Sequence, residues 1–171
     1  MTKDLDNGIG LILAEIDNLG IGGNTYVIFM SDHGSSNGMS NNSPLQRGKN
    51  FLYEGGIRVP FIVKGPNITA GSSCDEPIIG YDLFPTIGEL ADNSVDLPSV
   101  LEGQSLVPLF EQQSFSRNNP FYFHSPHYAT NQAKTPISAL VDGNYKIIVE
   151  YETGIESVSY THLTLPTIRL V

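Results

Sequence analysis

The sequence predicts an α/β fold with a mostly parallel sheet, followed by a small antiparallel α+β subdomain. Three observations support this prediction: an amphipathic helical pattern near the start, two continuous apolar runs typical of strands, and a later pair of strand-like segments around a turn dipeptide. The 171 residues suffice for one ordinary domain with a buried core. We expect residues 1–110 to form the α/β domain, residues 111–156 the subdomain, and residues 157–171 an unstructured tail.

The first element is a helix, because apolar residues recur at helical spacing from Leu5 to Leu19 with acidic residues and Asn between them. Gly20 stands where a helix ends in a left-handed cap. We expect this helix to pack with its apolar face on the sheet.

Two apolar, β-rich runs follow, "TYVIFM" at 25–30 and "RVPFIVKGP" at 58–66. Such runs are typical of strands covered on both faces. "DLFPTIGELAD", from Asp82, predicts a second helix with Pro85 in its first turn, where proline is tolerated. Farther along, two strand-like runs flank Asp142-Gly143, which predicts an antiparallel hairpin.

Composition excludes several functions. Eighteen acidic against nine basic side chains give a net charge of -9, which disfavours nucleic acid as a partner, so an anionic substrate would need a local positive field. No apolar run approaches the roughly 18 residues that suggest a membrane span. Cys74 is the only cysteine, so no intrachain disulfide can form.

The stretch "SDHGSSNG" places Asp32 and His33 directly after the first predicted strand. Open α/β sheets bind ligands at the carboxyl ends of their strands, and a hard cation would neutralise the acid there. An isolated Asp-His-Gly is more often only a turn or a cap. The sequence that follows makes the site interpretation stronger.

That sequence is "LQRGKNFLYEGGIRVPF", residues 45–61. The loop is long enough to bring Lys49 back to the same sheet edge, where its ammonium group can bind an anionic oxygen. In isolation, Lys49 reads as a solvated surface lysine. For Glu54 and Arg58 we favour a structural role in the loop, in which they pair with each other or with the backbone.

The segments "NTYVIFMSDHG", "RGKNFLYEGGIRVPFIVKGP" and "YDLFPTIGELAD" together resemble the type I sulfatases, the formylglycine-dependent arylsulfatase family of the alkaline phosphatase superfamily. The resemblance implies an alkaline-phosphatase-like sandwich, of which residues 1–110 form the C-terminal part of the catalytic domain. It also implies that Asp32 and His33 ligate Ca²⁺ or another divalent cation, and that Lys49 is a catalytic residue that binds the sulfate oxygens. The imidazole of His33 suits zinc better than calcium.

The same resemblance implies that the nucleophile is missing. The family derives its formylglycine from the Cys or Ser of a Cys/Ser-x-Pro/Ala-x-Arg motif upstream of the Asp-His-Gly loop. Cys74 lies downstream and has no matching Arg, so it is not that residue. We therefore expect the formylglycine only in a full-length protein, and this chain to be an inactive C-terminal fragment that binds metal weakly.

The resemblance further implies a sulfated small molecule or polysaccharide as substrate, and a periplasmic or secreted full-length protein. The segment "FYFHSPHYATNQAKTP" belongs to the predicted subdomain, from which related sulfatases often bring a loop to the pocket rim. His127 and Tyr128 are therefore candidate substrate contacts, although an ordinary loop position is the preferred interpretation.

The end of the chain differs from the rest. "VSYTHLTLPT", residues 158–167, resembles the translation of a sequencing-library adapter found at the ends of short metagenomic assemblies, with a natural terminal strand as the alternative. Two other functions stay open. One is a phosphodiesterase or phosphonate hydrolase of the same superfamily, and the other is a short natural protein that has lost catalysis and serves as a binding module.

Overall fold

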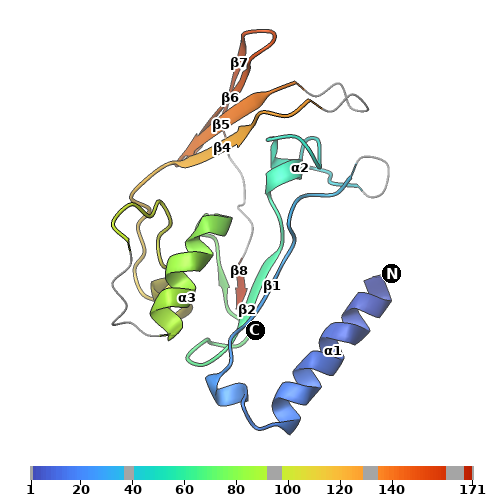
Figure 1. The fold of residues 1–171 in the computed structure, drawn as a ribbon, viewed down its shortest axis with the longest axis vertical. Helices are drawn as coiled ribbons and strands as arrows, with labels where there is room; N and C mark the ends of the chain where they lie inside the picture. The colour runs from blue at the N-terminus through green and yellow to red at the C-terminus, as the bar shows by residue number, and fades with distance from the viewer. Residues whose placement is uncertain (1, 37–40, 92–97, 129–134, 161–167, 171) are drawn as a thin grey trace.

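The computed structural model describes residues 2–36, 41–91, 98–128, 135–160 and 168–170. It contains two four-stranded sheets, with the N-terminal helix to one side of the first sheet and the second sheet at the far end of the molecule (Figure 1). None of the described helices is long and apolar enough to cross a lipid bilayer.

Helix α1 spans Thr2–Asn18, and Gly20 has a φ of 66°, so the predicted helix and its left-handed end are confirmed. The predicted packing is wrong: α1 has no buried residue, and Leu5 and Ile12 are more than half exposed. Only its C-terminal part, at Leu13 and Ile16, lies beside the sheet. An amphipathic pattern shows which face of a helix favours burial, but not what covers that face.

The first sheet has the order β1-β2-β8-β3. Its strands are β1 (Val27–Met30), β2 (Phe61–Lys64), β3 (Ser73–Cys74) and β8 (Ile168–Leu170). Strand β1 follows the short 3-10 helix η1 (Gly22–Asn24). Its residues Phe29 and Met30 are 36% and 38% exposed, so the expected cover on both faces is wrong for β1. Phe61 and Val63 of β2 are buried as predicted.

The expected mostly parallel sheet is also wrong for these strands. β1 pairs with β2 in antiparallel register, Ile28 opposite Val63, and only the β2–β8 pair is parallel. A parallel pair needs a long crossover, usually a helix, whereas the described part of the β1–β2 connection contains only α2 (Glu54–Ile57). The connection therefore leaves and re-enters the sheet at the same edge.

The core lies between β2 and the segments that follow it. The 3-10 helix η2 (Gly80–Asp82) leads into α3 (Leu83–Ala91), which has Pro85 in its first turn as predicted. After it comes the short α4 (Val107–Phe110). The buried cluster joins residues of β2 to this region: Phe61, Val63, Leu106, Leu109 and Phe110.

The second sheet is an antiparallel meander in the order β4-β5-β6-β7. Its strands are β4 (Phe121–Ser125), β5 (Ile137–Asp142), β6 (Tyr145–Glu150) and β7 (Ile155–Tyr160). Asp142 pairs with Tyr145 and Gly143 has a φ of 53°, which confirms the predicted hairpin.

The expected unstructured tail is wrong at both of its ends. Residues 157–160 belong to β7, and β8 at residues 168–170 fills the place between β2 and β3. The unpaired edge of a strand accepts a further short strand readily, because its N–H and C=O groups lack partners. The middle of the tail, residues 161–167, lies outside the described residues.

Candidate functional site

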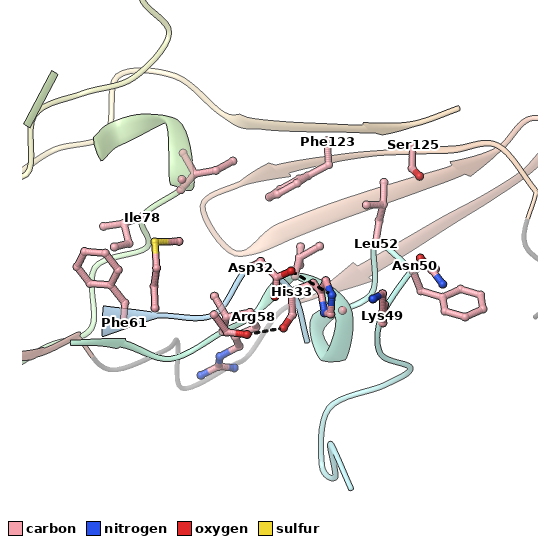
Figure 2. Close-up of a pocket in the computed structure, with 18 of the residues that line it drawn as sticks. Asp32, His33, Lys49, Asn50, Leu52, Arg58, Phe61, Ile78, Phe123 and Ser125 are labelled. Carbon is pink, nitrogen blue, oxygen red and sulfur yellow. Dashed lines mark hydrogen bonds and ion pairs between the residues drawn. The ribbon is translucent and has the colours of Figure 1, made fainter. Parts of the chain in front are cut away.

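A cavity of about 500 Å³ lies at the edge where β1 ends and β2 begins. Asp32 and His33 reach it from the end of β1, Lys49 from the connecting loop, Arg58 from the entry to β2, and His127 from the segment after β4. The structure thus brings together five of the seven side chains singled out from the sequence. Figure 2 shows Asp32, His33 and Lys49 on one side of the cavity, with β4 on the other.

Asp32 and His33 present a matched pair of donor atoms. Nδ1 of His33 lies 2.8 Å from the carbonyl oxygen of Gly34, which can only accept, so Nδ1 carries the proton. Nε2 of a neutral ring then keeps its lone pair, and it lies 3.2 Å from Oδ2 of Asp32. Adjacent ligands of a Ca²⁺-sized cation are separated by about 3 Å. These two atoms are therefore spaced to share a cation.

Exposure differs between the two side chains, at 82% for Asp32 and 36% for His33. The carboxylate of Asp32 is open to solvent and therefore pays no desolvation cost. The Ser31 hydroxyl donates a hydrogen bond of 2.8 Å to the carbonyl oxygen of His33, which holds the backbone beside the imidazole. Among the residues that the structure describes, no group of three or more His, Cys, Asp or Glu side chains converges on one point. The described chain therefore offers two such ligands and not a complete shell.

Two loops and α2 are joined through their backbones around this pair. The amide of Gly34 donates to the carbonyl of Gly56 at 2.9 Å, and the amide of Gly55 donates to the carbonyl of Gln46 at 2.8 Å. A Cβ on Gly34 would overlap the carbonyl oxygen of Gly55, so a side chain cannot be added here without moving the backbone. The glycines of "EGG" and "DHG" are thus explained by close backbone approach.

The same network fixes the backbone of Lys49, whose amide donates to the carbonyl of Ser35 at 2.9 Å. Arg47 and Asn50, on either side, have positive φ values of 62° and 76°. These left-handed residues turn the loop sharply around Lys49. The ammonium group of Lys49 is therefore carried by a loop whose backbone is hydrogen-bonded to the segment that follows Asp32 and His33.

Glu54 is the first residue of α2 and Arg58 directly follows its last residue, so both lie in the connection between β1 and β2. The amide of Arg58 donates to the carbonyl of Glu54 at 2.9 Å, but the Glu54 carboxylate pairs with Lys146 at 2.8 Å, a partner that the sequence analysis missed. Burial lowers the pKa of Arg58, and the nearby Glu54 opposes that shift. The Arg58 guanidinium points away from Asp32 and His33 (Figure 2).

The two candidate substrate contacts, His127 and Tyr128, differ in their position relative to the cavity. His127 lines the cavity, whereas Tyr128 is exposed and its hydroxyl donates to Glu152. That bond raises the pKa of Tyr128. Cys74 is half-buried in β3, beside Leu109 and Gln112 and outside this cavity.

Sequence reasoning missed the opposite wall, which includes Phe123 and Ser125 of β4 (Figure 2). Alternation along β4 places these two side chains on the same face, and that signal was available in the sequence. It did not say that this face would lie over the loop of Lys49. The fold alone supplies that information.

Comparison with known proteins gives a consistent result. The profile of the family described as Sulfatase matches residues 1–93. A sulfatase of Formosa agariphila is 32% identical over 166 residues, covering 86% of this chain and 30% of that protein. The steryl-sulfatase of Rattus norvegicus is 35% identical over 132 residues, covering 71% of this chain and 23% of that protein.

Among solved structures, BT4656 in complex with its substrate D-glucosamine-2-N,6-O-disulfate matches with a TM-score of 0.70 at 22% identity. The match covers 91% of this chain and 31% of that chain. The predicted alkaline-phosphatase-like α/β fold is thereby confirmed. This chain spans less than a third of the length of these three proteins.

Proposed function

Because this chain belongs to the sulfatase family, we propose that it forms the cation-binding and sulfate-binding part of an enzyme that hydrolyses sulfate esters. The observation that carries the proposal is the convergence of Asp32, His33 and Lys49 on one cavity from separate segments. Acidic and imidazole donors suit a divalent cation, and an ammonium group beside them suits an anion.

Asp32 and His33 provide only part of the coordination shell that a divalent cation needs. Asp32 and His33 supply two ligands 3.2 Å apart, whereas calcium takes six to eight. We propose calcium, with zinc as the alternative that the imidazole favours. When bound, a divalent ion supplies Lewis-acid polarisation of a sulfate oxygen.

The roles of the chain's own residues follow from their positions. Lys49 would bind a sulfate oxygen and offset the charge of the ester, since the whole chain carries a net charge of -9. His33, with its Nδ1 proton held by Gly34, would present Nε2 toward the cation. His127 would contact the part of the substrate beyond the sulfate.

We further propose that this chain does not turn over sulfate esters, because its sequence has no Cys/Ser-x-Pro/Ala-x-Arg motif. Sulfated small molecules and polysaccharides are the proposed substrates of the whole protein. Its export to the periplasm or beyond remains a prediction from the family resemblance.

Binding of inorganic sulfate, followed by amide NMR in the presence of Ca²⁺, tests the proposal. Addition of sulfate should shift the Gly34 and Lys49 amides, and Lys49→Met should weaken that response by about tenfold, the loss of one charge-assisted contact. Lys64→Met removes an exposed cation at the end of β2 and is the matched control. An equal loss in both variants would indicate general charge attraction and refute a built sulfate site.

A further inference from the structure

Lys146 is a buried cation in the second sheet, only 2% exposed. Its Nζ atom donates to Oε1 of Glu54 at 2.8 Å, across 92 positions of sequence. Glu54 is the first residue of α2, which lies directly below the second sheet (Figure 1). This ion pair therefore joins the second sheet to the loop that connects β1 and β2.

This ion pair lies in an environment where apolar side chains are the usual occupants. Lys146 lies on the same face of β6 as the buried Ile148, whose partner across the ladder is the buried Ala139 of β5. Burial lowers the pKa of Lys146, and the bond to Glu54 opposes that shift. Well-packed apolar residues often replace buried ion pairs without loss of stability, so stability alone does not explain this pair.

On the side of Glu54, the pair holds the helix that organises the site. Gly56 of α2 accepts the bond from Gly34, and Gly55 donates to Gln46 in the loop of Lys49. A displacement of α2 would therefore move the Asp32–His33 segment and the Lys49 loop together.

On the side of Lys146, the pair holds the opposite wall of the cavity. Strand β6 pairs with β5, and β5 pairs with β4, which carries Phe123 and Ser125. Both of these side chains line the cavity across from Lys49 (Figure 2). The ion pair thus spans the two walls between which a substrate would lie.

We propose that Lys146 and Glu54 are positioning residues, which set the spacing between the cation-and-sulfate wall and the β4 wall of the cavity. Neither side chain touches the substrate in this proposal. What the cavity binds rests on the proposed function above, but the positioning role itself concerns only the geometry of this chain.

Amide hydrogen exchange of the full chain tests the positioning role without any ligand. In Lys146→Met, the Gly34 and Lys49 amides should exchange at least about tenfold faster relative to the core amides of β2, because α2 opens locally. Arg117→Met is the matched control, because it breaks the buried ion pair with Asp82, neither of whose residues lies in the connection between β1 and β2. In that variant, core and loop amides should change together.

A double variant separates positioning from stability. Glu54→Gln with Lys146→Met removes both charges, so no unpaired carboxylate remains. We expect its urea midpoint to recover toward that of the unaltered chain while the exchange of Gly34 and Lys49 stays fast. Recovery of both quantities would overturn the proposal, and so would Lys146→Met changing all amides equally.

Sulfate binding in the presence of Ca²⁺ provides a second readout. Lys146→Met should weaken sulfate binding by about tenfold and Lys146→Arg should restore much of it, because arginine keeps the charge. If the unaltered chain shows no response to sulfate, the proposed function fails, while the exchange experiment still decides the positioning role.

Discussion

Arg117 and Asp82 form a two-pronged ion pair in the interior, across 35 positions of sequence. Nη1 donates to Oδ1 at 2.8 Å and Nη2 donates to Oδ2 at 2.6 Å. Asp82 is fully buried and also accepts bonds from the amides of Ile79 and Gln104, both at 2.9 Å. The guanidinium in turn lies over the ring of Phe121, 4.7 Å from its centre. The pair therefore joins the start of α3 to the first strand of the second sheet.

Removal of the arginine should destabilise the fold strongly. In Arg117→Met, the Asp82 carboxylate stays buried without its counter-ion, and we expect a loss of about 3–5 kcal/mol in the free energy of unfolding. Urea denaturation measures this loss. Lys64→Met, at an exposed position, should stay within about 0.5 kcal/mol of the unaltered chain. A similar small effect in Arg117→Met would contradict the structural role.

The neighbouring Tyr81 should lose its hydroxyl proton at a higher pH than an ordinary tyrosine. Burial and then the charge of Asp82 raise its pKa above the usual value of about 10. The folded state then keeps a proton that the unfolded chain loses, so this contribution to stability is complete below about pH 10 and is lost as the pH rises further. The pKa of Tyr128 is raised as well, so the test is made in a Tyr128→Phe background, where Tyr81→Phe should remove the alkaline end of the tyrosinate absorbance curve. A curve that only shrinks uniformly would refute the shift.

Local elements followed from the sequence because their signals are local. The spacing of Leu5 to Leu19 predicted α1, and Asp142-Gly143 predicted the turn between β5 and β6. The gathering of Asp32 and Lys49 at one sheet edge was also predicted, since a strand end and a returning loop limit where those residues can lie.

Long-range pairings did not follow from the sequence. Nothing near Glu54 indicates Lys146 as its partner, and a lysine within the β6 pattern looks like an outward-facing residue. The predicted parallel direction of the strands was wrong for a related reason. An apolar run such as β2 can have the same composition in a parallel and in an antiparallel sheet.

Strand β8 offers a direct test of the tail. Arg169 pairs with Ile62 on one side and Ser73 on the other, so Arg169→Pro should remove a ladder bond and lower the stability by about 1–2 kcal/mol. Arg169→Thr keeps a good strand former and is the control. Urea midpoints give the comparison. Equal midpoints for the two variants would mean that β8 adds nothing to the sheet, as expected of an adapter-derived tail.

Gly34, which directly follows His33, gives the sharpest local test. In Gly34→Ala, the new methyl group would overlap the carbonyl oxygen of Gly55, so the backbone must shift at a cost of about 1–3 kcal/mol. Because Gly34 follows His33 directly, the shift should also weaken the proposed binding of Ca²⁺, measured by calorimetry. Gly10→Ala is the same chemical change in α1, where no atom lies within 4 Å of the new carbon. That control should stabilise the chain by up to about 1 kcal/mol, the ordinary preference of a helix for alanine, and leave Ca²⁺ binding unaltered. A Gly34→Ala variant as stable as the control would show that the close approach of the two loops is not required.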